Sequence, residues 1–276
     1  SVRFDLSKSS NADSHAKESS EISNKAILIR QLAIQSGAIE GLYPGLTLNR
    51  LNLSVDSLSP ATASRLELET SIEWDEKQAP LKINARIIPT ATFDGLTIRD
   101  LELQSRDLNL DYAGYLSASR SGQFSGEGQL SVAKLSLRQW LRASNFAVPK
   151  TNELDRFNRF QLNTGLKVST DLVSLRPFAL VLDETSIDGR VDLQLNPLNI
   201  DLELLADTLN LDHYLTTESD ANSGQSDLSP GLLGTYKIDL GSLIVNQREL
   251  TDVGVDLGIG TDEITLGRLD ANLFGG

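Results

Sequence analysis

Apolar and polar residues alternate along most of the chain with a period of two. Successive side chains of a β-strand point to opposite faces, so each alternating run predicts a strand with one apolar and one polar face. The clearest runs are residues 64–74, 80–87, 189–195, 199–206, 236–240 and 253–259. Turn-forming residues separate neighbouring runs, as Asn196 and Pro197 do between two of them. Short turns favour antiparallel pairing, because parallel strands need long crossover connections.

The alternation changes phase in the middle of several runs. For example, Leu48 belongs to an even-numbered apolar set, whereas the set that follows begins with the odd-numbered Leu51. A slip of one residue moves the apolar side chains to the other face of a strand unless a bulge or turn intervenes. We therefore predict bulges or corners near Arg50, Asp100 and Lys134.

Two segments change from strand spacing to helix spacing. Residues 135–141 and 209–215 both follow the pattern L-x-L-x-x-[WY]-L, with Trp140 and Tyr214 at the aromatic position. At each point we expect a strand to leave the sheet and a short helix to fold over, with its aromatic side chain covering the apolar edge. These helices are predicted at about 137–145 and 211–217. A third helix is predicted over 151–160, where Leu and Phe side chains recur every three residues behind a Thr or Asn N-cap.

Polar segments divide the chain. Residues 1–25 are rich in Ser, Asn and charged side chains and contain few apolar ones, so we expect a flexible polar linker there. Residues 216–231 predict a loop. The remainder, 26–276, is predicted to form one β-domain from two repeat-like units of about 26–145 and 146–276.

Each predicted strand has an apolar face that must meet another apolar surface. A sandwich or a closed barrel would cover this face with protein, whereas an open curved sheet would leave it lining a groove. Aromatic residues make up only 5% of the chain, and large aromatic side chains are efficient core fillers. A sandwich or barrel is the default expectation from composition, and the scarcity of aromatic residues shifts the balance slightly towards the open sheet. We predict a mainly β fold in which a long curved antiparallel sheet forms an open, taco-like apolar groove with a few short capping helices.

Composition narrows the classes of partner. The net charge of −13 disfavours nucleic acid and a broad polybasic surface for anionic headgroups. The chain has no cysteine, which excludes disulfides and thiol catalysis, and no methionine, so we expect it to be a processed or truncated piece of a longer protein. No apolar run approaches the roughly 20 residues that a membrane-spanning helix needs.

Side chains suited to catalysis are scarce. The two histidines are His15, in the polar N-terminal segment, and His213, in the second aromatic turn, and no Ser-His-Asp arrangement can be assembled from them. A cluster of four acidic residues lacks the spacing of an EF-hand loop. Its members are Asp183, Glu184, Asp188 and Asp192. The sequence therefore predicts no enzyme, no metal site and no cofactor.

Residues 157–215 resemble the core repeat of the AsmA family, the AsmA/TamB-like periplasmic proteins of Gram-negative bacteria. The matching features are LVLDET at 180–185, the pair Asp188-Gly189, the strand pair that follows, and LNLDHYL at 209–215. The resemblance implies a periplasmic β-rich body tethered to the inner membrane by a helix, which we expect to lie outside this chain. Distant relatives of the family, including eukaryotic chorein-type bridge proteins, are thought to pass lipids along an apolar groove.

The similarity extends to two flanking segments, 136–157 and 266–276, and more loosely to 26–116. It leads us to expect a chain that binds phospholipid or another acyl-chain lipid and supports lipid transport or outer-membrane homeostasis, with an outer-membrane partner. Leucine suits such a groove because it is apolar and needs no specific geometry. The candidate groove residues are Leu180, Leu182, Leu193, Leu195, Ile200, Leu202 and Leu204.

Two other functions are compatible with the same sequence. A non-enzymatic scaffold or assembly factor for outer-membrane proteins would use its strand edges to bind partners. A lipocalin-like barrel would enclose one small apolar ligand in a ring of about eight strands. The repeated aromatic turn and the number of alternating runs fit the closed barrel poorly.

Overall fold

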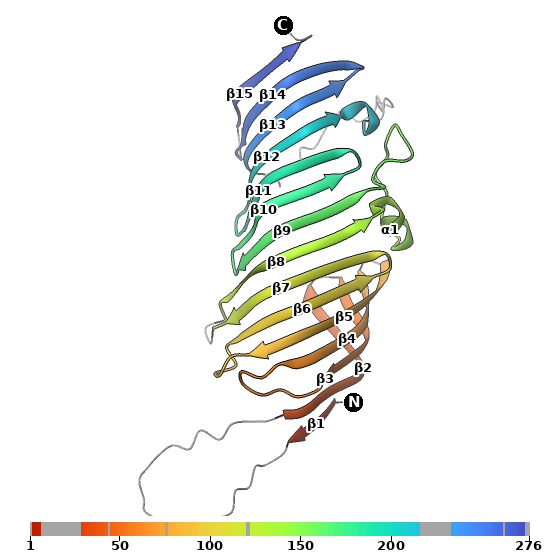
Figure 1. Cartoon of the computed structure of the whole chain (residues 1–276), viewed down its shortest axis with the longest axis vertical. Coiled ribbons are helices and arrows are strands. Elements are labelled where there is room, and N and C mark those ends of the chain that lie inside the picture. The colour runs from red at the N-terminus through yellow and green to blue at the C-terminus, as the bar shows by residue number, and fades with distance from the viewer. Residues whose placement is uncertain are drawn as a thin grey trace, which may run out of the picture.

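The computed structural model describes residues 2–6, 29–43, 45–74, 77–119, 122–215, 233–261 and 263–273. Within these ranges, fifteen strands form one sheet in which every strand lies beside its predecessor in the chain, from β1 at one end to β15 at the other (Figure 1). The two end strands do not pair with each other, so the sheet is open. The predicted long curved sheet with few helices is confirmed.

The strands are β1 (Val2–Leu6), β2 (Ile29–Tyr43), β3 (Leu46–Val55), β4 (Ser64–Trp74), β5 (Lys77–Pro89), β6 (Gly95–Ser105), β7 (Leu108–Ala118), β8 (Phe124–Leu135), β9 (Phe160–Ser169), β10 (Leu172–Leu182), β11 (Thr185–Leu195), β12 (Leu198–Asn210), β13 (Gly234–Val245), β14 (Arg248–Ile259) and β15 (Ile264–Leu273). The helices are α1 (Leu137–Ala143) and the 3-10 helix η1 (Leu211–His213).

The strand register keeps apolar residues on one face of the sheet. Directly opposed residues share a face, and Leu193 of β11 lies opposite Val173 of β10 and Ile200 of β12. The other face carries charged pairs, such as Arg190 with Glu203 across β11 and β12. The alternation in the sequence therefore becomes one apolar and one polar face for the whole sheet.

The three predicted bulges are confirmed. Arg50 and Asp100 adopt positive φ angles of 55° and 51°, and the pairing register shifts at both positions. The register of β8 against β9 also shifts between Val132 and Leu135, on either side of Lys134. Each bulge absorbs one residue, so the apolar side chains return to the same face after the phase change.

The prediction that all strands pair antiparallel is wrong for one pair. β12 and β13 run parallel, with Leu202 beside Tyr236. β12 and β13 begin at the same side of the sheet. The connection from the end of β12 to the start of β13 therefore runs between opposite ends of the strands. The predicted loop over 216–231 falls within this connection and lies outside the described residues.

Three further expectations differ from the structure. The predicted helix over 151–160 consists of turns, because side chains rather than a helical ladder bind its backbone, as described below. The helix expected at 211–217 is the three-residue η1. Part of the expected linker over 1–25 is the strand β1, in which Val2, Phe4 and Leu6 alternate with polar residues. The rest of the expected linker lies outside the described residues.

The two repeat-like units are not separate bodies. β8, which ends the first unit, pairs with β9 of the second along most of its length. What repeats is the connectivity: β6–β7–β8 is followed by α1, and β10–β11–β12 is followed by η1, with both helices at the same edge of the sheet (Figure 1).

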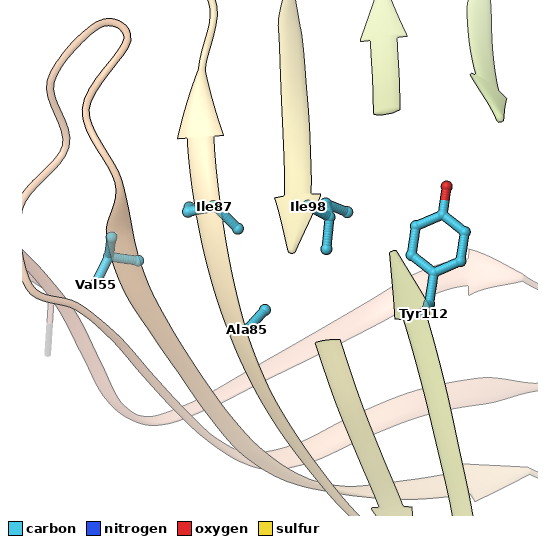
Figure 2. Close-up of a cluster of buried hydrophobic side chains, with 5 residues drawn as sticks. All are labelled: Val55, Ala85, Ile87, Ile98 and Tyr112. Atoms are coloured by element: carbon cyan, nitrogen blue, oxygen red, sulfur yellow. The ribbon is translucent and has the colours of Figure 1, made fainter. Parts of the chain in front are cut away.

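The buried apolar side chains of the described chain come from the strands of the sheet. The largest buried cluster gathers side chains from β3, β5, β6 and β7 on the apolar face (Figure 2). Its members are Val55, Ala85, Ile87, Ile98 and Tyr112. The described strands pack extensively only against their sheet neighbours. Side chains of a single layer can bury one another only where they converge, so the apolar face is the concave one at this cluster.

Candidate apolar binding surface

The seven candidate groove residues lie together on one face of three adjoining strands. Leu180 and Leu182 are on β10, Leu193 and Leu195 on β11, and Ile200, Leu202 and Leu204 on β12. Leu195 is 44% exposed, and the other six are half-buried by their neighbours in the sheet. The structure thus brings all the candidates together.

The same face continues well beyond these three strands. On one side Leu180 lies opposite Leu162 of β9, and on the other Leu204 lies beside Ile238 of β13. A second buried cluster, formed by Ala206, Leu240 and Val253, extends the face to β14. The candidate set omitted these neighbours although their alternation is equally regular, because it was confined to the segment with the strongest family resemblance.

No described segment forms a second layer over this apolar face. The surface is formed mainly by aliphatic side chains and passes from strand to strand through the paired positions of the sheet. Exposure of the apolar side chains is largest on β15, where Leu269 is 67% exposed. Among the described residues, this face of the sheet therefore stays uncovered by protein.

Trp140 holds α1 against a hairpin turn of the sheet. The Ser136 side chain caps the helix by accepting a hydrogen bond from the Gln139 N–H. Trp140 Nε1 donates to the Ser105 carbonyl at 3.0 Å, where β6 turns into β7, and its ring stacks on Phe146 at 5.8 Å. The expected edge position is observed, and the polar end of the indole fixes the helix there.

Tyr214 makes the corresponding contact after η1. Its hydroxyl donates to Asp183 Oδ2 at 2.9 Å, where β10 turns into β11, and its ring meets Phe157 edge-on at 5.5 Å. Both aromatic residues therefore reach back to the hairpin that precedes their own strand. The repeated motif fastens hairpin turns along one edge of the sheet.

Asp183 accepts several of the hydrogen bonds along this edge of the sheet. Its buried carboxylate accepts backbone N–H hydrogen bonds from Phe157, Asn158 and Arg159 at 2.8, 2.9 and 3.1 Å, besides the Tyr214 hydroxyl. These bonds explain why the predicted helix over 151–160 does not form: its last amides point at a carboxylate from another hairpin.

Charged side chains reinforce the same region. The buried Arg156 guanidinium bonds Glu153 within its own segment and Glu184 Oε2, at 2.6 Å, in the β10–β11 turn. Arg138 of α1 donates through Nε to the Arg156 carbonyl at 2.7 Å. The segment between α1 and β9 is thus tied to both the helix and the hairpin.

The four acidic residues of the sequence cluster do not come together in one site. Asp183 and Glu184 take part in the contacts just described, and Asp192 forms an ion pair with Arg176 across β10 and β11. Asp188 is exposed on the same strand as Asp192. Among the described residues, no group of three or more His, Asp and Glu side chains is placed to hold a metal ion.

The Tyr214 contact makes the stability of the fold depend on pH in the alkaline range. Burial and the hydrogen bond to Asp183 raise the pKa of the Tyr214 hydroxyl above its ordinary value of about 10. Above that pH the unfolded chain releases the proton while the folded chain retains it, so stability falls as pH rises. We expect Tyr214→Phe to reduce the slope of the urea midpoint between about pH 9 and pH 11. A Tyr214→Phe variant with the same slope as the parent would contradict the assignment.

Comparison with protein-family models, curated proteins and solved structures finds no match for this chain. Within the described parts of the chain, neither helix has the length and apolar character needed to cross a membrane.

Proposed function

We propose that this chain binds phospholipid acyl chains on its apolar face and supports lipid transport or outer-membrane homeostasis. The observation that carries the proposal is the aliphatic face, which runs across the sheet without a second protein layer among the described residues. In this proposal the chain is the periplasmic part of an AsmA-like protein tethered to the inner membrane. It delivers lipid towards an outer-membrane partner and performs no catalysis.

The energetics favour such a ligand. Each CH₂ group removed from water contributes about 0.8 kcal/mol, so shielding a 14-carbon chain is worth about 11 kcal/mol. The strands β9 to β14 have 10 to 13 residues. At about 3.3 Å per residue they extend about 33–43 Å, slightly more than the ~30 Å hydrocarbon core of a bilayer. An acyl chain therefore fits along a strand or across several of them.

Native mass spectrometry tests the proposal directly. Chain purified without detergent from Gram-negative cells is expected to carry phospholipid and, after delipidation, to bind a fluorescent phospholipid. Leu202→Asp, which places a charge in the middle of the apolar face beside Val191 and Tyr236, should lower lipid retention at least about tenfold, since burying an unpaired carboxylate costs more than 1.4 kcal/mol.

Leu205→Asp is the matched control. Leu205 lies on the same strand, faces the polar side of the sheet and is 59% exposed, so the same substitution there should leave lipid retention unchanged. Parent protein that is free of lipid and fails to bind the fluorescent probe would refute the proposal. Equal losses in the two variants would also count against binding on the apolar face.

A further inference from the structure

Four hairpin turns form a row along the edge of the sheet opposite to α1 and η1 (Figure 1). They join β5 to β6, β7 to β8, β9 to β10 and β11 to β12, and we call them the turn row. Hydrogen bonds link neighbouring turns, from the Ala118 N–H to the Asp94 carbonyl at 2.9 Å, from the Phe124 N–H to Thr170 Oγ1 at 3.2 Å and from the Leu195 N–H to the Asp171 carbonyl at 2.9 Å. The turn row is therefore one connected surface.

Three of the four turns carry large exposed apolar side chains. Phe93, Phe124, Leu195 and Leu198 are between 42% and 45% exposed. Phe93 has a positive φ of 58°, which bulky residues rarely adopt. Its turn therefore exposes an aromatic side chain at a position where Asn or Gly would be accommodated more easily. Gathered apolar side chains of this kind mark interaction surfaces.

The polar groups of the turn row are mainly uncharged. Among its described residues only Asp94 and Asp171 carry a charge, and Arg120 lies outside the described residues. The Asp94 carboxylate accepts hydrogen bonds from the hydroxyls of Thr90 and Thr92 at 2.7 and 2.6 Å, so it is held within its own turn. Burying a charged group costs far more than burying a hydroxyl or an amide. The turn row can therefore enter a less polar environment at a modest desolvation cost.

The edge that carries the helices differs in charge. Leu154 is 81% exposed there, but it lies between Glu153 and Asp155, and the Arg156 guanidinium forms ion pairs with both carboxylates. Moving this edge out of water would remove the hydration of several charges at once. Exposed apolar side chains on the two edges therefore differ in what they can contact.

We propose that the turn row docks onto the surface of a lipid bilayer, with Phe93, Phe124, Leu195 and Leu198 inserted among the lipid headgroups. The strength of such binding scales with the apolar area that becomes buried. The bilayer surface that fits is electrically neutral, because the chain has a net charge of −13 and anionic lipid would repel it. Docking is therefore weak and reversible, and added salt does not weaken it.

Docking in this way brings the apolar face to the bilayer. Phe124 precedes Gly126 by two residues, and Gly126 lies opposite Val168 on the apolar face. Leu195 and Leu198 lie opposite each other on the same face. An acyl chain can then pass from the bilayer onto the apolar face without crossing the polar one. This last step rests on the proposed function, whereas the docking itself does not.

Cosedimentation with phosphatidylcholine vesicles at millimolar lipid tests the docking. The parent chain should bind, and Phe93→Asn and Phe124→Ser should each lower the partition coefficient about fivefold, because about half of each phenylalanine is available for burial. Together they should lower it about 25-fold. Asn adopts a positive φ readily, so the turn at position 93 is preserved. Vesicles rich in anionic phosphatidylglycerol should bind the parent chain more weakly.

Leu154→Ser is the matched control. It removes a more exposed apolar side chain from the other edge and should leave the partition coefficient unchanged. A parent chain that stays in solution, or equal losses in Phe124→Ser and Leu154→Ser, would overturn the docking. If vesicles are ignored while the parent sediments at twice 30.1 kDa and the double variant does not, the turn row contacts a second copy instead.

The docking and the proposed function can fail separately. After delipidation the Phe93→Asn/Phe124→Ser double variant should still bind the fluorescent phospholipid, and Leu202→Asp should still bind vesicles. Vesicle binding by a parent chain that carries no lipid would refute the proposed function alone. Lipid carried by a parent chain that never binds vesicles would refute the docking alone.

Discussion

Asp183→Ala is expected to lower the free energy of unfolding by about 4 kcal/mol, the sum of several lost hydrogen bonds to a charged and buried acceptor. The substitution leaves the amides of Phe157, Asn158 and Arg159 and the hydroxyl of Tyr214 without their partner. Asp183 is only 7% exposed, so water cannot replace the carboxylate without local opening. Urea denaturation at neutral pH, followed by far-ultraviolet circular dichroism, measures the change.

Two further variants show whether the carboxylate itself is responsible. Asp183→Asn keeps one acceptor oxygen and tolerates the positive φ of 52° at this position, so about half of the loss is expected. Asp188→Ala removes an exposed carboxylate from the next strand and should change stability by less than about 0.5 kcal/mol. If Asp183→Ala were as mild as Asp188→Ala, Asp183 would not be the centre of this edge.

The strands and the bulges could be predicted from the sequence because both are local properties. A period of two determines the two faces of a strand, and a slip of one residue, as at Arg50 or Asp100, is tolerable only where a bulge restores the face. The parallel pairing of β12 with β13 could not be predicted in this way. It depends on which edge of β12 receives the next strand, and alternation within a strand contains no information about its neighbour.

The position of the seven candidate groove residues on one face could be predicted for the same local reason. The contacts of Asp183 with the amides after Arg156 and with Tyr214, which form an edge network, were not predicted. Asp183 follows the last residue of β10 and belongs to a turn, where alternation does not predict the direction of a side chain. Its partners, the amides after Arg156 and the hydroxyl of Tyr214, are distant in the sequence. Only the repeated aromatic motif pointed to these contacts, because it singled out Tyr214.

The contacts along the hairpin turns matter for stability because the sheet has only a single layer. Within the described chain, most apolar side chains are half-buried rather than enclosed, so each contributes less to stability than a residue in a two-layer core would. The hairpin turns along one edge are instead held by Trp140 on Ser105 and by Tyr214 on Asp183. Fastening at the edge keeps the strands together while leaving the apolar face uncovered, which is what binding of an apolar ligand there requires.

The second large effect is expected at Gly189 in the middle of β11. Its φ angle of 154° is one that residues with a Cβ atom rarely adopt, at a cost of about 1–3 kcal/mol. A Cβ atom added there would lie 1.9 Å from the carbonyl oxygen of Glu203 on the neighbouring strand β12. That obstacle is backbone, so it can move only if the pairing of β11 with β12 is distorted.

Gly189→Ala is therefore expected to destabilise the chain by about 3–5 kcal/mol, combining backbone strain with displacement of the neighbouring strand. Gly258→Ala in β14 is the matched control: its φ lies outside the positive range that residues with a Cβ atom rarely adopt, and an added Cβ would come no closer than 3.7 Å to its nearest neighbour, Thr265. This control should stay within about 1 kcal/mol of the parent in the same urea titration. A Gly189→Ala variant as stable as Gly258→Ala would mean that β12 can shift away from β11 at little cost, and the sheet could not then hold the apolar side chains of these two strands in one fixed surface.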